Sequence, residues 1–316
     1  MTPGRSDTAI SFDKVGKEFD GRWIVHDLDV DVAAGTIVGL IGPSGCGKTT
    51  AVRLATGVYQ PSAGSVTVLG RHPTDLRAGE RVSIGYLPQQ PVLFDELSVM
   101  ANLRYHAGLN GVGQRRRRRL DDVLGLVELH GEESKRVRDI SGGMQRRLAL
   151  AAALVHEPPI AILDEPTAGI DPILRQKFWE HFRTMRNRGR TVVVTTQHVD
   201  EAIHCDSIVV LSEGQVIDVG APSELRRRAF GGDRVDLTLT SIADQPTVAR
   251  IRDLDGVTGV VVTGPNDLRA VVAGGSSDEL VAVLESIGLE VTQSSEPETD
   301  WNEIFIALMR RRGATA

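Results

Sequence analysis

The chain is poor in three residue types, and each scarcity narrows what the protein can do. Aromatic residues are only 4% of its 316 residues, which argues against a protein that binds single-stranded nucleic acid by base stacking. Its two cysteines, Cys46 and Cys205, provide neither a disulfide framework nor metal-ligand spacing, so they indicate a reducing compartment. Lysine is also rare, since 31 of the 36 basic residues are arginines, which we interpret mainly as genomic composition.

Long apolar segments are missing as well. No stretch approaches the roughly 18 apolar residues of a transmembrane helix, and the N-terminal segment lacks the basic start and apolar core of a signal peptide. We therefore expect another chain to cross the membrane if this protein works there. The remaining composition, 41% hydrophobic and 25% charged with a formal net charge of −6, is that of a globular protein. Its length suggests two domains.

A glycine-rich segment at residues 42–50, GPSGCGKTT, follows an apolar run and precedes a helical pattern. The spacing G-x-x-x-x-G-K-T is typical of a phosphate-binding loop. Its glycines let backbone N–H groups point at a polyphosphate, Lys48 adds a positive charge at the β/γ-phosphates, and Thr49 offers a hydroxyl to Mg²⁺. The residues expected to contact the nucleotide here are Gly42, Pro43, Ser44, Gly45, Cys46, Gly47, Lys48, Thr49 and Thr50. At Cys46 we favour a packing role over a reactive thiol.

Two acidic residues follow a second apolar run, at residues 160–163. Ligands bind at the carboxyl ends of strands in open α/β sheets, so Asp164 and Glu165 are expected beside the phosphates. Adjacent residues on a strand point in opposite directions, which allows them different roles. We expect Asp164 to hold Mg²⁺ and Glu165 to polarise the attacking water as a general base.

The pattern of elements predicts an α/β protein with a mixed sheet. Residues 25–32 alternate aspartate with Leu or Val, as in an antiparallel strand with one wet face. Residues 97–140 are helical, with Ser98 as an N-cap, and the apolar strands that follow alternate with helices, which indicates a parallel sheet. Beyond residue 234, the order β-α-β-β-α-β with a final helix suggests a small ferredoxin-like α+β domain.

Five consecutive arginines, residues 115–119, precede a helix whose apolar face is formed by Leu120, Val123, Leu124 and Val127. We expect these arginines to form a solvated helix face. Binding of anionic lipid or nucleic acid is the alternative.

Together the motifs resemble the ATP-binding cassette family. Besides the phosphate loop and the acidic pair, SGGMQ lies at residues 141–145 and AGID at 168–171, and all landmarks follow the family's order. The resemblance spans residues 9–228. It implies a P-loop NTPase cassette at residues 8–228 with a helical subdomain at about 90–140. It also implies a head-to-tail dimer, in which one copy caps the ATP held by the other with Ser141, Gly142 and Gly143.

The same resemblance assigns roles outside the phosphate loop. Gln89 matches the glutamine that senses Mg²⁺ and the lytic water and links to the membrane subunit, and His198 matches the switch histidine near the γ-phosphate. Asp171 matches the loop that communicates across the dimer. Phe19 lies where the family places an aromatic ring on adenine, although Trp23 is close enough to compete. Two positions depart from the usual signature, which more often has Gln at Met144 and Leu at Ile140.

The C-terminal residues narrow the resemblance to one branch. A predicted linker at residues 229–234 leads to an accessory or dimerisation domain at 235–316, whose segments EPETDW and IFIAL are similar to those of daunorubicin-resistance-type drug and lipid exporters. In that branch a stand-alone ATPase pairs with a separate permease. The resemblance therefore implies an ATP- and Mg²⁺-dependent ATPase, peripheral on the cytoplasmic face of the membrane, without a nucleic-acid partner. A cassette ATPase uncoupled from transport and an importer ATPase remain alternatives.

Overall fold

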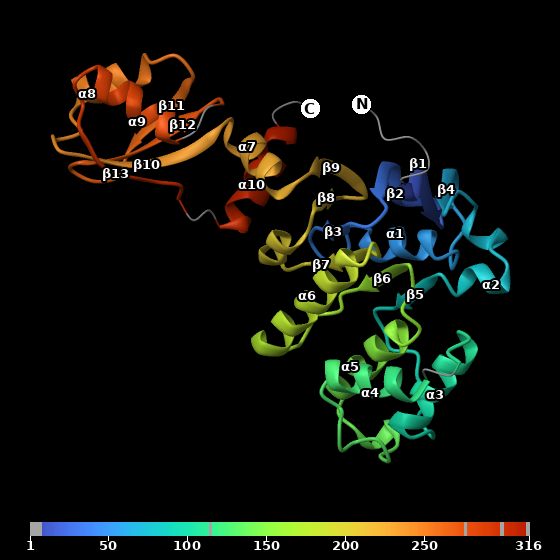
Figure 1. Cartoon of the computed structure of the whole chain (residues 1–316). Helices are drawn as coiled ribbons and strands as arrows, with labels where there is room; N and C mark the ends of the chain where they lie inside the picture. Colours follow the sequence, from blue (N-terminus) through green and yellow to red (C-terminus); the bar gives the residue numbers. More distant parts are fainter. Residues whose placement is uncertain (1–7, 114–115, 275–276, 298–299, 314–316) are drawn as a thin grey trace. The chain divides into compact units, whose positions relative to one another are not determined.

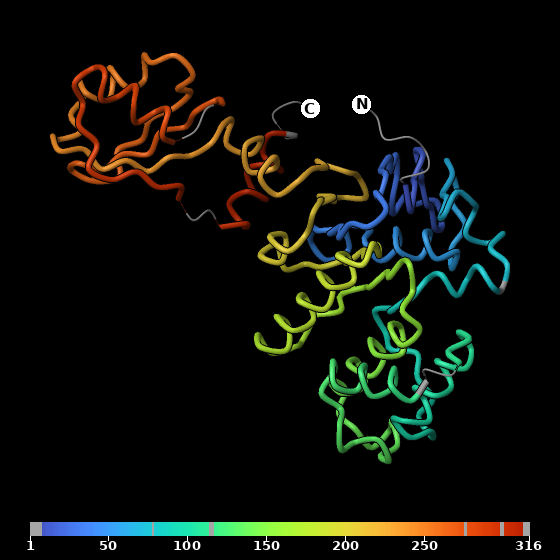
Figure 2. Tube along the Cα trace, viewed as in Figure 1, coloured from blue at the N-terminus to red at the C-terminus, as the bar shows by residue number. Residues whose placement is uncertain are grey.

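A computed structural model describes residues 8–113, 116–274, 277–297 and 300–313. The chain divides into two compact units between Val219 and Gly220, and each unit is described by itself. Figure 1 labels the elements of both units, and Figure 2 traces the chain through them. Within the described residues, no helix has the length and apolar character required to cross a bilayer.

An antiparallel three-stranded sheet begins the first unit, with the order β2-β1-β4. Its strands are β1 (Thr8–Phe19), β2 (Arg22–Ala33) and β4 (Ala63–Val68). Along β2 the aspartates at 27, 29 and 31 are exposed, whereas Leu28, Val30 and Val32 are buried. The predicted antiparallel strand with one wet face is therefore confirmed.

A six-stranded sheet carries the elements that lead into the candidate site. Its order is β5-β6-β7-β3-β8-β9, and every pair from β5 through β8 is parallel. Strands β3 and β7 are buried along their whole length, because helices and the other sheet cover both faces. The strands are β3 (Ile37–Ile41), β5 (Ile84–Leu87), β6 (Ile160–Asp164), β7 (Thr191–Thr196), β8 (Ser207–Ser212) and β9 (Gln215–Gly220).

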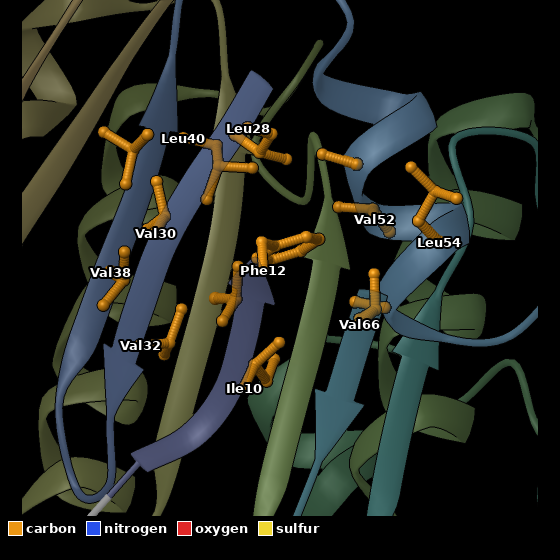
Figure 3. Close-up of a cluster of buried hydrophobic side chains, with 14 of the residues drawn as sticks. Ile10, Phe12, Leu28, Val30, Val32, Val38, Leu40, Val52, Leu54 and Val66 are labelled. Carbon is orange, nitrogen blue, oxygen red and sulfur yellow. The ribbon is translucent and has the colours of Figure 1, made fainter. Parts of the chain in front are cut away.

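One hydrophobic core joins the two sheets and helix α1 (Lys48–Ala55). Figure 3 shows Phe12 of β1 and Val30 of β2 in the same cluster as Leu40 of β3 and Val52 of α1. Burying a side chain of this kind contributes about 1.5–3 kcal/mol. The core therefore anchors both ends of the loop between β3 and α1, the predicted phosphate loop.

Helices dominate between β5 and β6, as predicted. They are α3 (Val99–Leu109), α4 (Arg116–Leu126) and α5 (Gly142–Leu154), and Ser98 Oγ caps α3 by accepting the Ala101 N–H at 3.1 Å. Part of the arginine run does more than face solvent, because Arg119 donates to the carbonyls of Leu154 and Val155 and pairs with Glu157. Arg117 and Arg118 are exposed, and residue 115 lies outside the described residues. The other helices of this unit are α2 (Ala78–Arg81), α6 (Pro172–Asn187) and the 3₁₀ turns Pro73–Asp75, Val137–Asp139 and Val199–His204.

The second unit has the predicted β-α-β-β-α-β order followed by a helix. Its four strands form a sheet in the order β11-β12-β10-β13, and each neighbouring pair is antiparallel, as in a ferredoxin-like domain. The strands are β10 (Asp233–Leu239), β11 (Val257–Val262), β12 (Asp267–Val272) and β13 (Val291–Ser295). The helices are α7 (Pro222–Phe230), α8 (Gln245–Arg252), α9 (Ser277–Ser286) and α10 (Trp301–Gly313).

The linker predicted at residues 229–234 is wrong. Helix α7 continues to Phe230, Gly231 ends it in the left-handed conformation (φ 79°), and β10 already begins at Asp233. Helix α7 contacts α10, and Arg226 pairs with Glu296, so α7 belongs to the second unit. The pair Gly231-Gly232 suggested a flexible connection, whereas glycine just after a helix is also the usual helix cap.

Candidate active site

The loop after β3 folds around the Lys48 side chain. Lys48 is 5% exposed, and its Nζ donates hydrogen bonds to the carbonyls of Gly42 at 2.8 Å and Pro43 at 2.9 Å. Gly47 adopts φ 106°, a conformation that favours glycine. At Gly42 there is no room for a side chain, because a Cβ would come within 2.1 Å of the Leu211 carbonyl oxygen. The loop's own residues and the neighbouring strand β8 together set its shape.

Cys46 lies inside this loop and is 3% exposed. Burial raises the pKa of its thiol above the ordinary value, although Lys48, with Nζ 3.9 Å from the sulfur, acts in the opposite direction. The thiol therefore stays protonated near neutral pH and serves as a packing group.

Asp164 ends β6 and is completely buried. Its Oδ1 accepts a hydrogen bond from the Thr195 hydroxyl on the neighbouring strand β7, while Oδ2 has no partner within the described residues. A buried carboxylate oxygen without a donor is rare in proteins and requires an explanation. Binding of a cation at this oxygen would supply one.

The surroundings of Asp164 fit Mg²⁺ better than a metal bound by protein ligands alone. Across the described part of the chain, no group of three or more His, Cys, Asp or Glu side chains is arranged to hold a metal ion. Mg²⁺ usually takes one or two carboxylates and completes its shell with water and substrate phosphates. One free carboxylate oxygen beside a phosphate loop matches that requirement.

Glu165 does not lie on the strand, which corrects the expectation that strand alternation sets its direction. β6 ends at Asp164, and Glu165 takes the left-handed conformation with φ 52°. Its N–H donates to the Thr195 carbonyl and hydroxyl oxygens at 3.1 and 3.0 Å, and its carbonyl accepts from the Arg146 guanidinium. The turn after β6 therefore orients this carboxylate.

Strand order brings further predicted residues to the same edge of the sheet. Gln89 follows β5 and is exposed, whereas His198 follows β7, is partly buried and donates its N–H to Thr196 Oγ1 at 3.0 Å. Because β5, β6, β7 and β3 are parallel neighbours, their carboxyl ends meet at one edge. Gln89, Asp164, His198 and the phosphate loop are therefore grouped by the topology.

The SGG turn opens α5. Ser141 Oγ caps the helix by accepting the Met144 N–H at 3.2 Å, and Gly142 and Gly143 are exposed. A Cβ added at Gly142 would meet no described atom within 4 Å. Asp171, at another helix start, has a structural task that we did not predict: its Oδ1 accepts the N–H groups of Ile173 and Leu174 and caps α6.

Both candidates for adenine stacking keep an exposed ring. Phe19 is 39% exposed and packs edge-on against Tyr59, with ring centroids 5.2 Å apart. Trp23 is 46% exposed and covers Gly16, where a Cβ would come within 2.6 Å of the indole. The structure therefore leaves both rings accessible.

Comparison with known proteins adds the family context. The ABC transporter family model matches residues 25–168. A daunorubicin resistance ATP-binding protein of Streptomyces coeruleorubidus is 36% identical over 307 residues, covering 96% of this chain and 96% of that protein. A Nod factor export ATP-binding protein I of Paraburkholderia xenovorans is 38% identical over 234 residues, 73% of this chain and 77% of that protein.

A solved structure resembles this chain over two thirds of its length. It is the dimeric post-hydrolysis state of an ATP-binding cassette bound to ADP and Pi, with a TM-score of 0.60 and 26% identity. The match covers 67% of this chain and 98% of that one.

Proposed function

Because the chain belongs to the ABC transporter family, we propose that it is the ATP-hydrolysing subunit of an exporter for a drug-like or lipid molecule. Transport then takes place through a separate permease, with this chain on the cytoplasmic face of the membrane. Similarity to a daunorubicin resistance protein over 96% of both chains supports export, as does similarity to a Nod factor export protein. An ATPase uncoupled from transport is not favoured by these relatives.

The observation that carries the proposal is the meeting of the phosphate loop, Asp164 and Glu165 at one edge of the sheet. Lys48 and the N–H groups at the start of α1 bind the phosphates of the substrate ATP, because the first N–H groups of a helix have no partner within it. Asp164, Thr49 and Gln89 hold Mg²⁺, which when bound neutralises charge on the phosphates. Orphaned Oδ2 of Asp164 supports this assignment.

The residues that act at the γ-phosphate are Glu165, directly after β6, and His198, after β7. Glu165 accepts a proton from the attacking water as the general base, and His198 contacts the γ-phosphate. Glu165 suits this role because its backbone is held on both sides by hydrogen bonds while its side chain is partly exposed. Phe19 or Trp23 stacks on the adenine.

The second half of each site comes from another copy of this chain. Glycine has a lower helix propensity than alanine, and no contact among the described residues explains why Gly142 lacks a side chain. Close approach of ATP bound to a second copy would explain it, together with Ser141 and Gly143. Asp171 then lies in the loop that communicates between copies. The dimeric solved relative supports this arrangement.

Replacing the proposed base tests the function directly. Glu165→Gln keeps the shape of the side chain but cannot accept the proton, so steady-state phosphate release should fall by at least ~10²-fold. ATP binding should persist, and the dimer should accumulate with ATP and Mg²⁺ in size-exclusion chromatography. Glu180→Gln, an exposed change on α6, is the control. Normal turnover in Glu165→Gln would show that another group is the base.

A further inference from the structure

Arg146 connects the SGG helix to the turn that holds the proposed base. It lies in α5, three residues after Gly143, and its Nη2 donates to the Glu165 carbonyl. Its Nε is buried and has no partner among the described residues. Arg146 is partly buried, and the Nε edge of its guanidinium is shielded from solvent.

The turn needs such support because Glu165 is strained. A left-handed conformation costs a non-glycine residue roughly 1–2 kcal/mol, and it persists only where the surroundings fix it. Hydrogen bonds hold Glu165 on both sides: its N–H bonds to Thr195, and its carbonyl accepts from Arg146 and, at 3.3 Å, from the Ala168 N–H. Arg146 is the side-chain donor that reaches this carbonyl from another element.

Arg146 acts on the backbone of Glu165 rather than on its carboxylate. Within the described residues, no ion pair joins the guanidinium to that carboxylate, although the guanidinium donates to the carbonyl of the same residue. An ion pair would favour the charged carboxylate and weaken it as a proton acceptor. Contact through the carbonyl alone orients the base without neutralising it.

The residues on either side of Arg146 hydrogen-bond to other parts of the chain. Gln145 donates to the carbonyls of Val137 and Ile140, before the SGG turn, and Arg147 donates to those of Val127 and Glu128 beyond α4. Among these three consecutive residues, Arg146 makes the bond to the catalytic turn. Arg147 is thus a matched control, because it is an arginine on the same helix that also bonds to backbone carbonyls.

We propose that Arg146 is a positioning residue that couples the Ser141–Gly143 turn of each copy to Glu165 of the same copy. The inference rests on the proposed function. In a head-to-tail dimer the SGG turn contacts the ATP of the partner, whereas Glu165 acts on the ATP of its own chain. Arg146 therefore makes hydrolysis at one site respond to nucleotide at the other, within one helical turn.

The test compares Arg146→Met with Arg147→Met in the full chain. Arg146→Met should lower kcat by about 10- to 100-fold, the effect of a misplaced catalytic group, with KM for ATP unchanged and the Hill coefficient for ATP reduced toward one. Arg147→Met should keep the wild-type kcat and Hill coefficient. Arg146→Lys restores a hydrogen-bond donor and should recover part of the lost kcat. If Arg146→Met fails to fold, Arg146→Lys is compared with Arg147→Met instead.

Two results would overturn the proposal: equal kcat and Hill coefficient in the Arg146 and Arg147 variants, or a rise in KM at constant kcat in the Arg146 variants. Either leaves the base assignment intact, since that depends on Glu165→Gln. Conversely, normal hydrolysis by Glu165→Gln would show that another group is the base.

Discussion

At the scale of single residues, Thr195 bonds to both acidic residues of the site, to the side chain of Asp164 and to the backbone of Glu165. Its hydroxyl donates to Asp164 Oδ1 and accepts from the Glu165 N–H, so one oxygen serves two neighbours. The bond to Oδ1 leaves Oδ2 as the free oxygen of Asp164. Thr195 therefore selects which oxygen is available to a cation and fixes the start of the strained turn.

Thr195→Val should slow ATP hydrolysis, although Thr195 is not one of the residues proposed to contact the nucleotide. The variant leaves a buried carboxylate short of a donor, which costs about 1–3 kcal/mol of unfolding free energy. We expect a lower kcat and a higher Mg²⁺ concentration for half-maximal phosphate release. Thr191→Val is the control, because Thr191 accepts the Gly35 N–H at the opposite end of β7. If both variants lose stability but keep the Mg²⁺ dependence, Thr195 has only a structural role.

Thr195 and Arg146 are examples of site residues that could not be predicted from the sequence. Lys48 and the acidic pair were predictable, because their function depends on neighbours in the chain and on a local strand–loop–helix pattern. Thr195 and Arg146 act on residues 31 and 19 positions away, respectively. Nothing in the local pattern marks them. The left-handed backbone of Glu165 could not be predicted from the sequence for the same reason, because the contacts that stabilise it come from β7 and α5.

At the scale of elements, periodicity predicted the strands and helices but misplaced some of their ends. β5 begins at Ile84, two residues later than the apolar pattern from residue 82 suggests, because α2 and its turn occupy the preceding positions. The end of α7 was misread for a comparable reason: its Gly231 cap resembles a linker. A glycine in the sequence indicates a permissive backbone position. Whether it ends a helix or lies in a linker depends on tertiary contacts.

Asp171 caps the start of α6 and also lies in the loop proposed to communicate between copies. Asp171→Ala should lower the unfolding free energy by about 1 kcal/mol through loss of the N-cap. Asp171→Ser restores a capping oxygen, so thermal denaturation should return to nearly wild type. ATPase activity should remain low in both variants if Asp171 also acts between copies. Recovery of activity together with stability in Asp171→Ser would limit Asp171 to capping.

At the scale of the whole molecule, the chain carries features that its own fold does not need. Gly142 opens α5 with empty space where its side chain would project. A single chain would lose nothing with alanine there, since alanine has a higher helix propensity than glycine. Retaining glycine is explained by an assembly larger than one chain.

Gly142→Ala should therefore separate folding from function. We expect unchanged or higher thermal stability, together with weaker ATP-dependent dimerisation and slower phosphate release. Gly79→Ala is the control, because Gly79 also lies in a helix with open space around its missing side chain. Full ATPase activity and normal dimerisation in Gly142→Ala would contradict the proposed composite site.

The buried thiols have a practical consequence for studying such an assembly. Cys46 and Cys205 are 3% and 7% exposed, and burial raises the pKa of both thiols. Maleimide dyes react with accessible thiolates, so the native chain should resist labelling at neutral pH. A single cysteine introduced on the surface can then carry a fluorophore alone, and the approach of two copies can be followed by energy transfer with both natural cysteines in place.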